Sequence, residues 1–371
     1  LLGYNQIVCV SCKNFTIYRR EMMAASKRIN YIDLAKGIAI LCVIIGHTFS
    51  AYDQGNILVQ FIYSFHMPLF FILSGWFAKE DNVAVRPAIL KKAKQLLIPY
   101  LIINIIKYII KIAVYGFTSK GLKTFVISLI YANGASGKTN LCMIPHLKIV
   151  GMSWFLIALF FCQIIYICLN NFSQKYNISL GMMVVMLGLT AFGLNDTVWL
   201  PFSLQPAMGG LVFYYVGHMM RKKEILEKKP SEMTWPMVVI AAFLWLSAIL
   251  FHTVGMHANS YPGMYSFLGA ICGTYFIVQF SKLIEKIPAV GSFLIWCGKN
   301  SIYIYAIHAM DVQALKIMKK IALDYIVLPS TKGALLMTAM RIVFILITAA
   351  LFILIKKGVH RMRTPKVISQ N

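Results

Sequence analysis

Two residues whose types and spacing suit catalysis, Lys36 and His47, lie in the first long apolar segment of the chain. In a helix that advances about 100° and 1.5 Å per residue, they share one face to within about 20° and lie about 16 Å apart. An imidazole can take a proton from a hydroxyl near neutral pH, and an ammonium group can bind an anion. This segment therefore predicts a proton acceptor and an anion-binding group on one helix face.

The elements that must position these residues are apolar helices. The 371-residue chain is 59% hydrophobic and 13% charged, with a mean hydropathy of +0.71, and its apolar runs approach the roughly 20 residues that cross a bilayer. We predict an all-α, polytopic transmembrane bundle of about ten helices, near residues 32–51, 57–78, 96–117, 152–169, 178–194, 200–219, 235–252, 263–283, 291–310 and 336–356. A shorter run, residues 122–132, is expected at the membrane interface because it is too short to span.

The distribution of Lys and Arg between the loops predicts the orientation. Most of them fall on one side if the N-terminus is cytoplasmic, so we expect both termini in the cytoplasm and a multi-pass protein of the inner (cytoplasmic) membrane. The net charge of +24 then reflects topology and attraction to anionic membrane lipids. Nucleic-acid binding is not expected, because the cations are scattered over short loops.

The two ends of the chain differ from the apolar middle. We expect residues 1–30 to be a cytoplasmic leader, 31–357 the membrane domain and 358–371 a basic cytoplasmic tail. Met22 or Met23 is the expected natural start, which would leave residues 1–21 outside the natural protein. Cys9 and Cys12 form a CxxC pair without a second ligand pair, so no metal site is expected.

Polar residues inside apolar spans cost a few kcal/mol each on insertion scales, and they are therefore candidates for function. They are Asp33, Lys36, His47, His66, Lys107, Lys111, His218, Lys299, His308 and Arg341. Lys111 and Arg341 are expected to extend toward an interface, and Lys299 is expected to mark a broken stretch. Lys107 lies near mid-span and needs water, an anion or a buried partner.

Acidic residues are scarce, with 12 Asp and Glu in the chain. Only Asp33 lies clearly within a predicted span, and Asp311 lies at the edge of another. Proton-coupled transporters usually relay protons through intramembrane carboxylates, so this function is disfavoured. Asp33 is predicted to pair with Lys36 one turn further on. It lies about 21 Å along the helix from His47 and cannot orient that imidazole.

The partner that orients His47 must therefore come from another helix. His66 and Ser74 on the second predicted span are the candidates. Gly75, which follows Ser74, fits better with close helix packing. His308 is expected near the outer membrane edge and carries less weight as a site residue.

Several motifs resemble the acyltransferase 3 family of integral-membrane acyltransferases. The segment RINYIDLAKGIA at residues 28–39, followed by His47, is similar to the family's first helix. The segment FHMPLFFILSGWF at 65–77 resembles the second helix of the fucose 4-O-acetylase-like branch. Two further segments, SWFL at 153–156 and NSIYIYAIH at 300–308, resemble later motifs of that branch.

This resemblance implies transfer of an acetyl group from acetyl-CoA to a hydroxyl of an envelope saccharide or lipid-linked sugar. In the family, the histidine of the first helix is the catalytic residue, here His47, and the preceding cation corresponds to Lys36. His66 joins them as a catalytic candidate. Whether His47 acts as a general base or carries the acyl group stays open. Partners in envelope polysaccharide assembly are also possible.

The basic segment before the third span departs from the family pattern. Where many members have Arg-x-x-Arg for binding the acyl-CoA, this chain has Lys91, Lys92 and Lys94. Lysine can bind phosphate as a point charge, so these residues and Lys36 are the expected donor-binding cations, although they also fit ordinary positive-inside residues. The alternative to an enzyme is a membrane carrier or flippase for a small polar solute, such as an amino acid, or for a glycolipid. A weaker third alternative is a noncatalytic partner in an envelope-assembly complex.

Overall fold

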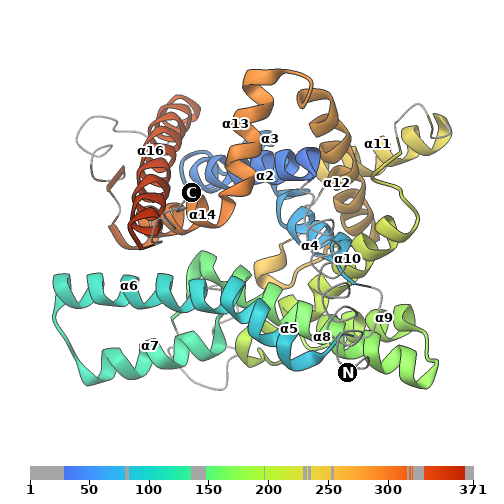
Figure 1. Ribbon diagram of the computed structural model, residues 1–371, viewed down its shortest axis with the longest axis horizontal. Helices are drawn as coiled ribbons and strands as arrows, with labels where there is room; N and C mark the ends of the chain where they lie inside the picture. The colour runs from blue at the N-terminus through green and yellow to red at the C-terminus, as the bar shows by residue number, and fades with distance from the viewer. Residues whose placement is uncertain are drawn as a thin grey trace, which may run out of the picture.

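The computed structural model describes residues 29–79, 83–134, 148–195, 197–228, 232, 235–251, 255–315, 317–318, 320 and 330–363. Within these ranges the chain is helical, apart from turns, loops and one isolated bridge between Gly255 and Ser260 (Figure 1). The predicted all-α class is confirmed. The expectations for Cys9, Cys12, Met22 and Met23 lie outside the described residues.

The described part of the chain contains fourteen α-helices used below. Their bounds are α2 Asn30–Tyr52, α3 Ile57–Tyr63, α4 His66–Trp76, α5 Val85–Lys92, α6 Ile98–Tyr115, α7 Ser119–Tyr131, α8 Trp154–Tyr176, α9 Leu180–Gly193, α10 Leu204–Lys222, α11 Trp235–Leu250, α12 Met264–Ile284, α13 Pro288–Lys299, α14 Ser301–Met310 and α16 Thr331–Arg363. Two π-helical segments, η1 Ala93–Leu97 and η7 Asp311–Leu315, and the 3₁₀ turn η3 Gly151–Ser153 complete the elements used below.

Six helical segments in the described part of the chain are long and apolar enough to cross a membrane. They are Asn30–Tyr52, Ile57–Trp76, Val85–Tyr115, Gly151–Tyr176, Met264–Ile284 and Thr331–Val359. Large apolar side chains are exposed along α6, α11 and α16, as at Ile105, Phe243 and Leu354. Such apolar surfaces fit contact with lipid rather than water, so the structure supports a multi-pass membrane protein.

Each of the ten predicted spans coincides with a helical segment, but the second and the ninth are each divided between two α-helices. The ninth, predicted as residues 291–310, is divided at Asn300 into α13 and α14. There the Asn300 side-chain Nδ2 donates to the Trp296 carbonyl at 2.8 Å, and Asn300 itself has non-helical φ and ψ. The second is divided between Tyr63 and His66. Lys299 thus marks a broken stretch, as expected.

The third predicted span is longer than expected, because helix continues from Val85 to Tyr115 through η1. Lys91, Lys92 and Lys94 therefore lie within this helix rather than in a loop before it. The run 122–132 belongs to α7, which lies beside α6 (Figure 1), where the Tyr108 and Phe125 rings stack at 4.2 Å. This α6–α7 hairpin projects from the rest of the bundle.

Pairs of glycines let two helix crossings close to backbone contact. A Cβ added to Gly37 of α2 would lie 2.0 Å from the Leu294 carbonyl oxygen of α13. One added to Gly75 of α4 would lie 1.8 Å from the Tyr214 carbonyl oxygen of α10. Gly298 and Gly217 are the opposite members of the two pairs. The close-packing interpretation of Gly75 is therefore confirmed. These crossings hold α2 and α4, which carry the first two family-like motifs, against α13 and α10.

The end of α2 is joined to the start of α16 by polar contacts. Asp53, directly after α2, accepts hydrogen bonds from Thr331 Oγ1 at 2.7 Å and from Asn56 Nδ2 at 3.0 Å. These hydrogen bonds to the charged form lower the pKa of the Asp53 carboxyl below its usual value. The contacts help to place α16 beside the half of α2 that carries His47.

Candidate active site

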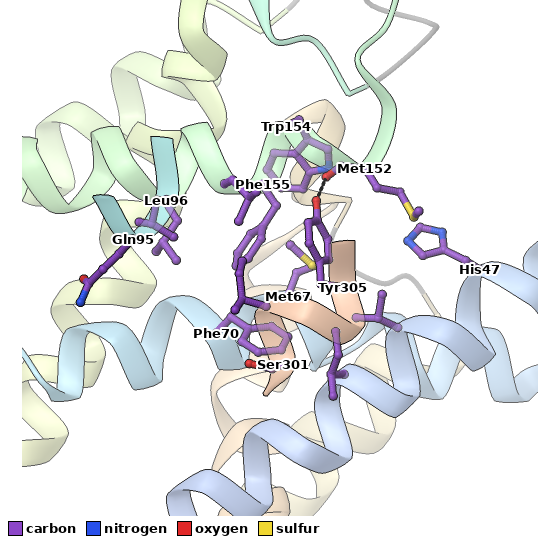
Figure 2. A pocket seen from close by; sticks show the side chains of 15 residues that line it. His47, Met67, Phe70, Gln95, Leu96, Met152, Trp154, Phe155, Ser301 and Tyr305 are labelled. Carbon is purple, nitrogen blue, oxygen red and sulfur yellow. Dashed lines mark hydrogen bonds between the residues drawn. The ribbon is translucent and has the colours of Figure 1, made fainter. Parts of the chain in front are cut away.

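A cavity of about 210 Å³ lies between α2, α4, η1, α8 and α14. Its wall is mainly apolar and aromatic, and its polar lining residues are His47, Gln95, Ser301 and Tyr305. Figure 2 shows His47 and Gln95 at opposite sides of the cavity, with the rings of Phe70, Phe155 and Tyr305 between them. Such a space suits a narrow, largely apolar molecule whose reactive end reaches His47.

His47 is half-buried, and its neighbours are mainly aromatic. The Tyr63 hydroxyl lies 3.5 Å from His47 Nδ1, a long hydrogen bond whose direction depends on the histidine tautomer. The ring of His308 lies 5.8 Å from the His47 ring, centroid to centroid. Tyr63 comes from α3 and His308 from α14, so three separate helices meet at His47.

His308 is more central than its sequence position indicated. It is fully buried, and neither of its ring nitrogens has a hydrogen-bond partner among the described residues. Tyr63 was absent from the sequence-based candidates. It lies three residues before His66 in the same predicted span, but its contact with His47 depends on how α2 and α3 cross, which the sequence does not show.

A buried ion pair lies next to His47 along α2. Arg341 of α16 donates from Nη1 to Thr48 Oγ1 at 3.1 Å, and its Nε lies 3.2 Å from Asp311 Oδ2. Asp311 Oδ1 also accepts from the Met318 amide. The expectation that Arg341 extends toward an interface is wrong: it is 5% exposed, because Asp311 supplies a partner inside the bundle.

Lys36 pairs with Asp33 as predicted, with Nζ 3.1 Å from Oδ1. The Lys36 ammonium also lies 5.3 Å from the centre of the Phe77 ring. Lys36 is not one of the residues lining the cavity. It is therefore placed toward the start of α2, and of the two polar candidates on this helix face His47 is the one that lines the cavity.

His66 is held by its own backbone rather than by His47. Its Nδ1 donates to the Ile62 carbonyl at 2.9 Å, and its ring lies 4.9 Å from the Tyr63 ring. It is buried and does not line the cavity. Ser74, further along α4, does not line the cavity either. His66 thus supports Tyr63, which contacts His47 in turn.

The basic segment Lys91, Lys92 and Lys94 comes just before the side of the cavity formed by η1. Gln95 and Leu96 line the cavity, whereas the three lysines do not. Lys91 and Lys94 are exposed. The lysines therefore precede the lining residues by one turn or less, on the helix that carries Gln95.

A second cavity, of about 550 Å³, lies between α6, α7, η3 and η7. Lys107 and Lys111 line it together with Lys148 and Lys320. The expectation that Lys107 faces a cavity or partner is confirmed. By contrast, His218 lines neither cavity, and its ring lies 5.7 Å from that of Tyr166.

The family model for an acyltransferase domain, acyltransferase 3, matches residues 29–356. The chain belongs to the acyltransferase 3 family. A comparison with curated proteins finds no match. As a member of this family it is a membrane acyltransferase, which implies an acyl donor and an acceptor, and the matched range contains both cavities. Among the described residues of this acyltransferase, no cluster of three or more His, Cys, Asp or Glu could hold a metal ion.

Proposed function

We propose that this acyltransferase moves an acetyl group from acetyl-CoA to a hydroxyl of an envelope saccharide or a lipid-linked sugar. The observation that carries the proposal is the position of His47 at one side of an apolar cavity, beside Tyr63 and His308. A sugar hydroxyl is a weak nucleophile near neutral pH, and a positioned imidazole is the side chain best suited to take its proton. The fucose 4-O-acetylase-like branch remains a prediction.

The donor enters on the side of the basic segment. Lys91, Lys92 and Lys94 bind the phosphates of the coenzyme, and Lys36 adds a further positive charge. The pantetheine arm then follows the cavity from Gln95 toward His47, where the aromatic wall excludes water that would hydrolyse the thioester.

Two mechanisms at His47 can complete the acetyl transfer. In the first, the imidazole takes the hydroxyl proton as the acceptor oxygen bonds to the carbonyl carbon. The C–S bond then breaks, and the leaving thiolate receives the proton from the imidazolium. In the second, a His47 nitrogen bonds to the carbonyl carbon as the C–S bond breaks and the thiolate leaves. The acceptor oxygen then bonds to that carbon as the C–N bond to His47 breaks, and the hydroxyl proton passes to the thiolate. Tyr63 and His66 orient the His47 ring in both routes.

The test is transfer of label from acetyl-CoA to envelope glycans in membranes containing wild type or His47→Ala. Loss of transfer in His47→Ala, with unchanged protein level and membrane insertion, is expected because the proton acceptor or acyl carrier is gone. His218→Gln is the matched control, since it changes a buried histidine that lines neither cavity. Absence of transfer by wild type, with movement of an amino acid or glycolipid by the purified protein in vesicles, would overturn the proposal.

A further inference from the structure

The second cavity has a strongly cationic lining that the acetyl transfer described above does not use. Lys107, Lys111, Lys148 and Lys320 line it, and no Asp or Glu is among the described residues that line it. In the described part of the chain, none of the four lysines forms an ion pair. A concave site lined by charges of one sign concentrates ions of the opposite sign.

Lys107 is held in place without being neutralised. Its Nζ donates to the Val150 carbonyl at 2.9 Å and to Gln313 Oε1 at 2.8 Å, and it lies 3.5 Å from Ser153 Oγ. All three partners are neutral, so the positive charge remains. A cation at this depth in an apolar helix is costly unless an anion or water compensates it.

Gln313 reaches Lys107 because Gly151 leaves room for it. Gly151 has a φ of +68°, and a Cβ there would lie 1.8 Å from Gln313 Nε2. Glycine therefore meets two requirements at this position, the left-handed backbone and the space for the amide. The π segment η7 supplies Gln313 to the opposite wall.

The η3 turn separates the two cavities. Met152 lines the cavity that contains His47, whereas Val150 and Gly151 line the lysine cavity. On the first side, the Tyr305 hydroxyl donates to the Met152 carbonyl at 2.5 Å. Figure 2 shows the Met152 side chain directed toward His47. The turn is thus a wall shared by the lysine cavity and the cavity that contains His47.

We propose that the lysine cavity binds a phosphate group of the acceptor and thereby directs an acceptor hydroxyl toward His47. This inference rests on the proposed function, because it assigns the substrate class of the same transferase. Lysines are flexible point charges that bind phosphate without the planar geometry that arginine imposes. The cavity volume leaves space for a sugar unit beside the phosphate. The acceptor is then a phosphorylated saccharide or a phosphate-linked glycan.

The test measures binding of glucose 1-phosphate and of glucose by calorimetry, with the full chain in nanodiscs of zwitterionic lipid. Lys111→Gln with Lys320→Gln removes two exposed charges of the cavity. We expect this double variant to bind glucose 1-phosphate about tenfold more weakly, from the loss of two close charges, while glucose binding stays unchanged. Lys286→Gln with Lys357→Gln is the matched control, since it removes two exposed lysines that line neither cavity.

Three results would overturn the inference. They are equal affinity for glucose and glucose 1-phosphate, equal weakening in the control variant, and a lysine-dependent site filled only by phosphatidylglycerol when that lipid is added. The third result would assign the phosphate to a membrane lipid. His47→Ala should keep glucose 1-phosphate binding. If the wild-type protein binds glucose 1-phosphate but transfers no acetyl label, the proposed function alone is contradicted. If it acetylates neutral sugars without binding glucose 1-phosphate, this inference alone is contradicted.

Discussion

His47 meets its neighbours through aromatic rings rather than through a carboxylate. The buried carboxylates of Asp33 and Asp311 are tied to Lys36 and Arg341 instead. Tyr63 is therefore the described side chain that hydrogen-bonds to the His47 ring. This makes the tyrosine hydroxyl the group that sets the orientation and tautomer of the imidazole.

Removing that hydroxyl tests the arrangement. We expect Tyr63→Phe to lower kcat about tenfold with little change in KM for acetyl-CoA, because the ring still packs but no longer orients His47. Steady-state acetyl transfer in membranes gives both constants. Tyr52→Phe is the control on the preceding helix, and an unchanged kcat in Tyr63→Phe would exclude the hydroxyl from the mechanism.

Residue-level predictions from the sequence succeeded where both partners lie on one helix. The Asp33–Lys36 pair follows from a separation of one turn. The contacts of His47 with Tyr63 and His308 depend instead on how α2, α3 and α14 cross. Spacing along one chain segment carries no information about such crossings, so sequence reasoning overlooked Tyr63 and gave His308 too little weight.

At the scale of elements, the two glycine crossings hold the helices of the site at backbone distance. Gly37 fixes α2 against α13, and Gly75 fixes α4 against α10. The carbonyls that a Cβ would strike belong to helix backbones, which cannot rotate away as a flexible side chain can. Shifts at these crossings would pass directly to His47 and to the aromatic wall of its cavity.

Gly75→Ala should therefore destabilise the protein by about 1–3 kcal/mol through overpacking and reduce acetyl transfer. Gly193→Ala is the matched control, because a Cβ at Gly193 at the end of α9 meets nothing within 4 Å. Thermal unfolding in detergent, with transfer assayed below the transition, measures both effects. Equal stability of the two variants would show that the α4–α10 crossing can open at little cost.

Hydropathy predicted where helices exist but not where they break. The apolar run continues across Ser64 and Phe65, so the division between α3 and α4 leaves no trace in a window average. At Asn300, by contrast, Lys299 interrupts the apolar run and indicated the break, and there the Asn300 backbone amide and side chain both donate to the Trp296 carbonyl. Both breaks lie beside the site, since Tyr63 ends the helix before the first break and Ser301 begins the helix after the second.

Across the whole molecule, the same three segments line both cavities: Val85–Tyr115, the η3 turn, and residues 301–315. Gln95 in the first cavity and Lys107 in the second are separated by about 18 Å of helix, more than half of the roughly 30 Å hydrocarbon layer. Substrates that use the two cavities would therefore arrive at different depths. Together with the uneven distribution of Lys and Arg, this predicts a cytoplasmic donor and an acceptor from the other side.

Labelling of single cysteines tests this sidedness. In a variant without the eight native cysteines, Lys91→Cys should react with a membrane-impermeant maleimide only after the cytoplasmic side is opened. Lys148→Cys should react in intact cells, because the helix Val85–Tyr115 between the two positions is long and apolar enough to cross the membrane. Both native lysines are exposed, so access is not limited by packing. Labelling of both positions from one side would contradict the separate approaches.

The π segment η1 also determines which way α6 faces. A π turn holds one residue more than an α turn, so everything after η1 is rotated relative to an uninterrupted α-helix that began at Val85. Regular α winding of the same residues would turn the following side chains by about 100°. Lys107 would leave its place opposite Gln313, although no residue of either cavity had been replaced. The π winding of η1 is thus itself a determinant of the lysine cavity.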